Sequence, residues 1–116
     1  MQLSLEAPLR KRAHNVWHEL AHAGQDVPYA KSPKAGRLVL HWKDLERAAA
    51  KAGVSRQDFY WSFDPLEKHA RDVAESVVGE VGKRGRISPQ RYDEIFEYFL
   101  DKAIAGAEEA EVMFGK

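Results

Sequence analysis

The sequence contains no cysteine and no long apolar run. The absence of cysteine excludes disulfide cross-links and thiolate metal ligands. No apolar run approaches the roughly 20 residues of a membrane-spanning helix, and the first residues lack the apolar core of a secretory signal. We therefore expect a soluble protein with a cytoplasmic location and no membrane partner.

An excess of one charge sign is also absent, because 18 Lys and Arg balance 18 Asp and Glu. The two halves differ, however: residues 1–56 carry ten basic and five acidic side chains, whereas residues 57–116 carry eight and thirteen. This asymmetry predicts either attraction between the halves within the fold or contact of the first half with a polyanion. A chain of 116 residues has the size of one domain, so we expect a single domain over residues 1–116.

Apolar periodicity and capping residues predict a mainly α-helical fold, a compact bundle of four to five helices with at most a small β-hairpin. The predicted helices are Pro8–His22, Trp42–Ala52, Ser55–Phe63, Pro65–Val81 and a helix capped by Ser88 that Gly106 interrupts. Ser55 and Asp64 are the predicted N-caps of the third and fourth helices, and Gly24 and Gly82 mark the predicted ends of the first and fourth. The last helix has the strongest periodicity, at Tyr92, Ile95, Phe96, Phe99, Leu100, Ala103 and Ile104. The segments Gln2–Glu6 and Arg37–His41 read as the hairpin strands, and Asp26–Gly36 reads as a loop.

Residues 18–22 read His-Glu-Leu-Ala-His, which is the HExxH pattern. On a helix, His18 and His22 share one face and can bind the same metal ion. Glu19 then lies next to the open coordination position, where a carboxylate takes the proton of a metal-bound water. The apolar residues of this helix fall on the opposite side from the histidines. Two interpretations follow, a zinc site and a polar stripe that faces solvent.

A zinc site requires a third protein ligand. The candidates in the rest of the chain are His41, Glu67, His69, Asp72 and Glu75. On a helical wheel, Glu67 falls at the border of the apolar face of its helix. This position suits a ligand that reaches across a cleft, and it equally suits a surface ion pair between Glu67 and Arg71.

Residues 60–75 read Tyr-Trp-Ser-Phe-Asp-Pro-Leu-Glu-Lys-His-Ala-Arg-Asp-Val-Ala-Glu. They resemble the segment "YWS, Pro-x-Glu-x-x-Ala-Arg-x-x-Glu" that follows the HExxH helix in gluzincin-like metallopeptidase-like domains of phage and mobile-element polyvalent proteins. The resemblance spans residues 13–82 and implies Zn²⁺ as cofactor and Glu67 as third ligand. His69 stands where an aromatic residue is usual, which makes it the alternative third ligand.

The resemblance also implies an activity, the hydrolysis of peptide bonds in a peptide or protein substrate, in a bacterial host or phage-encoded protein. Glu19 would be the general base, and Tyr60, His69 or Arg71 would stabilise the oxyanion. Zincin peptidases usually place a sheet before the HExxH helix, whereas about eight residues precede it here. A metal-binding domain without catalysis is therefore an alternative.

A second pattern resembles the helix-turn-helix of tetracycline-repressor-type regulators. It rests on Leu45, Ala48, Ala49, Ala52, Gly53, Val54, Ser55, Arg56, Phe59, Tyr60 and Phe63. The resemblance implies DNA as partner, with major-groove contacts from Ser55, Arg56, Gln57 and Tyr60. The alternative is a purely structural helix-turn-helix in which Phe59, Trp61 and Phe63 fill the core.

Two further interpretations remain. The aromatic residues Tyr98 and Phe99 of the last helix are compatible with self-association into a homo-oligomer. A structural or inhibitory phage protein with neither zinc nor DNA binding is the third functional class that the sequence allows.

Overall fold

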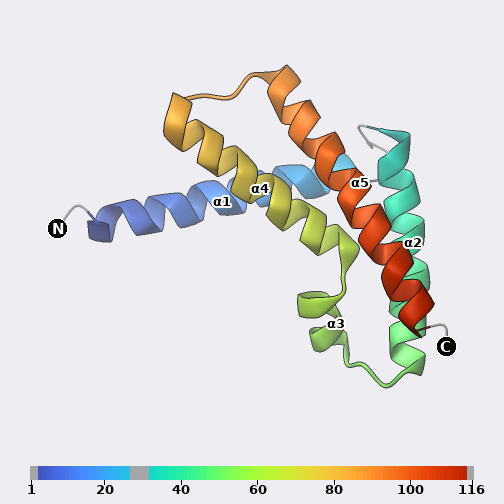
Figure 1. Cartoon of the computed structure of the whole chain (residues 1–116). Helices are drawn as coiled ribbons and strands as arrows, with labels where there is room; N and C mark the ends of the chain where they lie inside the picture. The colour runs from blue at the N-terminus through green and yellow to red at the C-terminus, as the bar shows by residue number, and fades with distance from the viewer. Residues whose placement is uncertain (1–2, 27–31, 115–116) are drawn as a thin grey trace.

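The computed structural model describes residues 3–26 and 32–114, with side chains described from residue 11 onward. The described residues form five α-helices: α1 (Leu3–Gln25), α2 (Pro33–Lys51), α3 (Arg56–Ser62), α4 (Pro65–Arg84) and α5 (Pro89–Phe114) (Figure 1). The prediction of a mainly α-helical bundle is thus confirmed. None of the described helices combines the length and apolar composition that crossing a bilayer requires.

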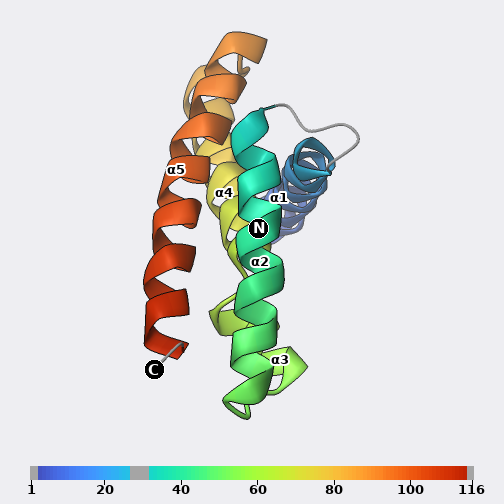
Figure 2. The ribbon, with the colours of Figure 1, turned by 90° about the vertical axis from the view of Figure 1, so that its right-hand side faces the viewer.

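The helices form two pairs, α1 with α4 and α2 with α5, and the pairs contact each other through α4 and α5. Helix α1 packs mainly on α4, α2 packs mainly on α5, and α4 packs on α5. Figure 2 shows α2 and α5 side by side, with α1 seen end-on. The short helix α3 lies below α4 in Figure 1 and connects α2 to α4. This arrangement brings the C-terminal half of α1 against the first turns of α4.

The main core lies where α4 and α5 meet α1 and α2. Its largest fully buried side chains are Phe96, Leu38, Leu100, His69, Val73 and Val77. The predicted apolar positions of the last helix are buried as expected, except Phe99, which is partly buried. A smaller cluster of Leu45, Ala49, Phe59 and Ala107 joins α2, α3 and α5. Burial of these apolar side chains is the main stabilising term of the fold.

Capping residues fix the entry of α3, α4 and α5. The Ser55 and Ser88 hydroxyls accept hydrogen bonds from the backbone N–H groups of Asp58 and Arg91, each at 3.1 Å. Asp64 accepts from two N–H groups of the first turn of α4. These three caps were predicted from the sequence.

Two glycines adopt the left-handed conformation that favours glycine. Gly53 (φ 88°) makes the turn between α2 and α3, as the helix-turn-helix pattern predicts. Gly85 (φ 79°) ends α4, so this helix continues past Gly82 instead of stopping there. The C-cap forms because the N–H of Gly85 donates to the carbonyl of Val81 at 2.7 Å.

The β-hairpin that the sequence allowed does not form in the described part of the chain, and the extended reading of its two segments is wrong. Arg37–His41 lies inside α2, and the described part of Gln2–Glu6 belongs to α1. The cap signal at Ser32, followed by Pro33 at the first helical position, begins α2 nine residues before its predicted start at Trp42. Residues 27–31 of the expected loop lie outside the described residues.

Other helix ends also differ from the prediction. Helix α1 begins at Leu3 and runs through Gly24 to Gln25, and α5 runs through Gly106 to Phe114. Glycine in a helix interior costs only about 1 kcal/mol relative to alanine, which tertiary packing offsets. The longer α1 carries Gln25 onto the same side as the histidines.

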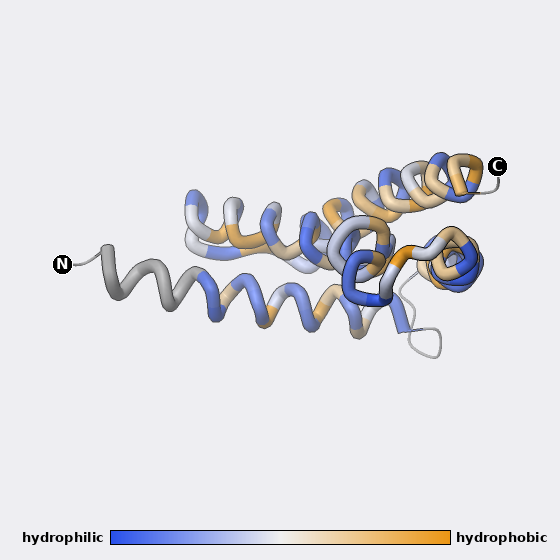
Figure 3. Tube along the Cα trace, turned by 90° about the horizontal axis from the view of Figure 1, so that it is seen from below, coloured by the Kyte–Doolittle hydropathy of each residue, from blue (hydrophilic) through white to orange (hydrophobic). Residues whose placement is uncertain are grey.

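The buried side of α1 is the side opposite to the one predicted. Val16 and Leu20 are 57% and 48% exposed, whereas Ala21, Gly24 and Gln25 are buried. Helix α1 lies alongside α4 with mostly hydrophilic residues along its described length (Figure 3). Ala21 belongs to the main core and Gly24 is buried, so the side of α1 that carries the histidines packs inward.

Candidate metal centre

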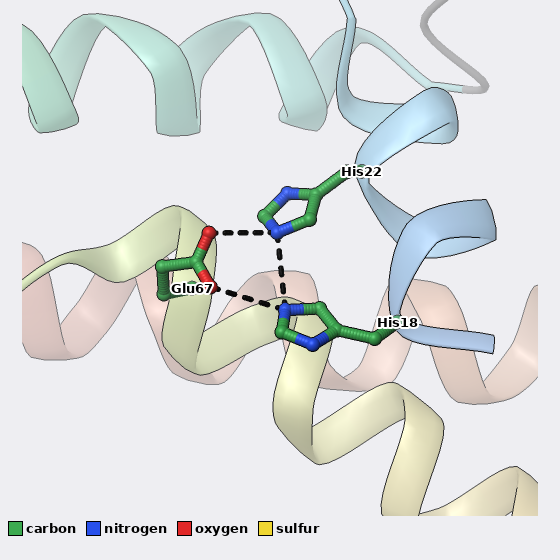
Figure 4. Close-up of side chains that lie close together, drawn as sticks. All are labelled: His18, His22 and Glu67. Atoms are coloured by element: carbon green, nitrogen blue, oxygen red, sulfur yellow. Dashed lines mark hydrogen bonds and ion pairs between the residues drawn. The ribbon is translucent and has the colours of Figure 1, made fainter. Parts of the chain in front are cut away.

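Three side chains from two helices converge on one point. His18 and His22 of α1 and Glu67 of α4 each offer one ligand atom, and these atoms lie within 4.8 Å of one another (Figure 4). The Nε2 atoms of the histidines are 3.1 Å apart. His18 Nε2 is 3.1 Å from Glu67 Oε1, and His22 Nε2 is 2.7 Å from Glu67 Oε2. The structure thus brings together the two histidines and the third residue that the sequence predicted.

These separations fit a shared divalent cation. Ligand bonds of about 2.0 to 2.2 Å in tetrahedral geometry place neighbouring ligand atoms about 3.3 Å apart. The two imidazole nitrogens are 3.1 Å apart, and each contacts a different oxygen of Glu67, at 3.1 and 2.7 Å. One ligand atom from each residue lies within 4.8 Å of the others, so rotation of the Glu67 carboxylate would direct one oxygen at an ion between the histidines.

The side chains at this point are partly shielded from solvent. Their exposed fractions are 19% for His18, 26% for His22 and 12% for Glu67. A site of this kind is dry enough to strengthen electrostatic interactions and open enough to admit a small molecule. His22 lies in the last turn of α1, where the partial negative charge of the helix C-terminus favours a cation.

A chain of hydrogen bonds behind His22 fixes its tautomer. The amide nitrogen of Gln25 donates to the Leu66 carbonyl at 3.0 Å, and this carbonyl can only accept. The amide oxygen of Gln25 therefore faces His22 Nδ1, at 2.8 Å, and accepts its hydrogen. In the neutral ring, Nε2 then carries a lone pair directed at Glu67. Two acceptors 2.7 Å apart need a proton or a metal ion between them.

The same chain explains His69. Its Nε2 lies 3.0 Å from the Phe96 carbonyl, and its Nδ1 lies 2.7 Å from the Gln25 amide nitrogen. Both ring nitrogens are thus used, as donor and acceptor respectively, and the side chain is fully buried. Burial lowers the pKa of His69 to about 4, so the ring is neutral at pH 7. The structure places this alternative third ligand behind the cluster, as its support.

Gln25 is the functional residue that the sequence reasoning missed. It is 3% exposed and links His22, Leu66 and His69. The signal was its position three residues after His22, which on a continuing helix lies on the same side. Ending the predicted helix at His22, on account of Gly24, removed Gln25 from consideration.

Tyr60 borders the cluster from α3. Its hydroxyl donates a hydrogen bond to the Glu67 carboxylate, and this bond, together with some burial, raises the pKa of Tyr60. The ring itself is 42% exposed. Tyr60 therefore holds the carboxylate from the solvent side, while Arg71, predicted as a surface partner, forms no ion pair with Glu67 among the described residues.

Glu19 has no contact with the three converging side chains. It is exposed and lines a shallow hollow with Asn15, Val16 and Leu20. On the helix it lies about 60° around the axis from His22.

The remaining candidate ligands lie elsewhere. His41 pairs with Glu111 of α5 at 3.0 Å. Asp72 pairs with Lys68 at 3.4 Å, and Glu75 lines a groove between α1 and α4. Among the described residues, the two histidines and Glu67 form the single group of three potential ligands.

The residues predicted for DNA recognition are all exposed, and they differ in their contacts. The Ser55 hydroxyl caps α3. Arg56 and Tyr60 line a hollow toward α2, and Tyr60 also contacts Glu67. Gln57 is exposed. In the structural alternative, Phe59 is buried as predicted, but Trp61 is 63% exposed and so does not fill the core.

Comparison with known proteins does not assign the chain to a family. The chain matches no protein-family model, no curated protein and no solved structure at a significant level. The arguments for function therefore rest on the geometry of the site.

Proposed function

We propose that the protein binds one zinc ion through His18, His22 and Glu67 and that this centre is of the hydrolytic type. The observation that carries the proposal is the convergence of two imidazole nitrogens and one carboxylate oxygen within 4.8 Å, from helices 49 residues apart in the chain. Imidazole and carboxylate together suit Zn²⁺ better than the hard cations Mg²⁺ and Ca²⁺, which prefer oxygen ligands alone.

The number of ligands supports a catalytic centre over a structural one. Structural zinc sites are closed by four protein ligands, whereas catalytic sites use three and keep one position for water. A bound zinc ion lowers the pKa of that water to about 7 and polarises a carbonyl oxygen. Glu19, which follows His18 in the chain, would serve as the general base of such a centre.

The support behind the ligands also favours a metal centre. Metal-binding histidines commonly donate their second ring N–H to an oxygen acceptor that fixes the tautomer. His22 does so toward Gln25, and the Glu67 carboxylate accepts a hydrogen bond from Tyr60. A solvent-facing polar stripe would not need buried partners such as Gln25 and His69.

Zinc titration of the metal-free protein tests the proposal. The protein is stripped with a chelator and titrated with ZnCl₂ in a calorimeter. We expect one zinc ion per chain, and loss of binding in His18→Ala, His22→Ala and Glu67→Gln. The matched control is His41→Gln, because His41 is a half-buried histidine paired with Glu111 and lies outside the cluster. Absence of binding, or equal losses in the control and the cluster variants, would refute a zinc site at this position.

A further inference from the structure

A hollow between α2 and α3 lies next to the candidate metal centre. Its volume is about 590 Å³, within the range of about 300 to 1,000 Å³ that small-molecule sites occupy. We call it the α2–α3 hollow. Its apolar part includes the buried side chains Ala49 and Phe59 and the ring of Trp42. An apolar or aromatic group of a ligand would be shielded from water there.

The rim of the α2–α3 hollow carries basic side chains from both helices, namely Lys43, Arg47 and Arg56. Lys43 and Arg56 form no ion pair with any residue of the described part of the chain, and Arg47 approaches only the exposed Asp44, at 3.9 Å. These cations are therefore available to an anionic ligand.

The acidic residues of the hollow are Glu46 and Asp64. The Asp64 carboxylate accepts hydrogen bonds from the Trp42 indole N–H at 3.2 Å and from the backbone N–H groups of Leu66 and Glu67 at 2.9 and 3.3 Å. Its charge is thus compensated by three donors. Glu46 is exposed on the rim, so the basic side chains still outnumber the acidic ones.

Tyr60 connects the hollow to the metal centre. Its side chain lines the hollow, and its hydroxyl is hydrogen-bonded to Glu67. Asp64 lines the hollow as well and caps α4 three residues before Glu67. A molecule seated in the hollow therefore lies one side chain away from the cluster.

We propose that the α2–α3 hollow binds the oxyanion end, a carboxylate or a phosphate, of a small substrate whose apolar group rests on Trp42 and Phe59. The role of this ligand as a substrate rests on the proposed function, since the rest of the molecule would extend past Tyr60 to the zinc ion. Charge-assisted hydrogen bonds from Lys43 and Arg56 would supply the preference for an anion. The described residues form no strand that could hold a substrate, so the contacts would come from side chains of α2, α3 and the segments that follow them.

Binding of three probes to the metal-free protein, in the presence of a chelator, tests the proposal. The probes are N-acetylphenylalanine, its neutral amide and phenyl phosphate, and backbone amide shifts of Phe59 and Tyr60 in NMR spectra locate them in the hollow. We expect at least one anionic probe to bind about tenfold or more tightly than the amide. The tighter of the two anions identifies the substrate as a carboxylate or a phosphate.

Variants separate a specific site from general attraction to a basic surface. Lys43→Gln and Arg56→Gln are expected to remove the preference for the anion, whereas Lys51→Gln, an exposed lysine of α2 outside the hollow, should preserve it. The proposal would be overturned if the acid and the amide bound equally well or if none of the probes bound. It would also be overturned if the double variant Lys43→Gln, Arg56→Gln kept the preference for the anion. The probes are tested without zinc, so a negative probe experiment does not contradict the zinc site. Likewise, a negative zinc titration does not contradict anion binding in the α2–α3 hollow.

Discussion

The side-chain oxygen of Gln25 lies 2.8 Å from Nδ1 of His22 and holds that ring with its second nitrogen directed at Glu67. The relationship orients a candidate metal ligand from the buried side of α1. It also makes Gln25 a positioning residue, which acts through His22 and not on the ion itself.

The first prediction concerns Gln25. Gln25→Ala removes the acceptor for His22 Nδ1–H and leaves His69 without one of its partners. We expect zinc affinity to fall by about 10- to 100-fold, the usual effect of removing a supporting partner of a metal ligand. Calorimetric titration measures the loss. Gln25→Glu, which retains an oxygen acceptor, should bind zinc more tightly than Gln25→Ala, and the reverse order would contradict the positioning role.

A second prediction concerns the stability of the metal-free protein in acid. The pKa of His69 is about 4 in the folded protein because of burial, compared with 6.5 for an exposed histidine. Between these values the unfolded chain binds the additional proton, so the free energy of unfolding decreases as the pH falls from about 6.5 toward 4. At about 1.4 kcal/mol per pKa unit, the loss is on the order of 3 kcal/mol.

Denaturant unfolding at several pH values in chelator measures this loss. His69→Phe should show a shallower dependence on pH than the wild type, whatever its absolute stability. The His69 ring signals in NMR spectra of the wild type provide a direct check. A ring that takes up its proton near pH 6.5 would contradict the buried, neutral His69.

A third prediction tests the helical register of α2. Leu38 is fully buried, whereas Leu40 is 62% exposed. Leu38→Ala should lower the free energy of unfolding by about 2 to 5 kcal/mol, and Leu40→Ala should change it by less than about 0.5 kcal/mol. In an extended segment both side chains would lie on the same face. If the two substitutions lowered the free energy of unfolding by similar amounts in chemical denaturation, an extended conformation of Arg37–His41 would be favoured over the helix.

A fourth prediction concerns Tyr60 and Glu67 in the metal-free protein. The hydrogen bond to the Glu67 carboxylate is the largest cause of the raised pKa of Tyr60. Glu67→Gln should therefore lower the pH at which Tyr60 ionises, because the variant removes the negative charge and the strongest acceptor. NMR titration of the labelled tyrosine ring measures this. An unchanged titration would separate Tyr60 from the cluster.

The helical class and most caps were predictable from the sequence, because they depend on local signals. Ser55, Asp64 and the periodicity of the last helix are signals of this kind. The error at Arg37–His41 arose because a short apolar run does not distinguish a strand from a buried helix. The preceding Ser32-Pro33 pair carried the deciding information.

The candidate site depends both on local sequence signals and on the tertiary packing of the helices. The spacing of His18 and His22 predicts a shared side of a helix, and the resemblance indicated Glu67. Which side of α1 packs inward is a tertiary property: Ala21 is fully buried while Val16 and Leu20 are exposed. The periodicity of the apolar residues in the sequence predicted the opposite side. The role of Gln25 depends on that same packing.

Anomalous X-ray scattering at the zinc absorption edge, from crystals of the zinc-loaded protein, tests the central claim most directly. We predict a single peak about 2.0 to 2.2 Å from the Nε2 atoms of His18 and His22 and from one carboxylate oxygen of Glu67. A peak located elsewhere, or none at saturating zinc with these three side chains still hydrogen-bonded to one another, would contradict a metal centre at this position.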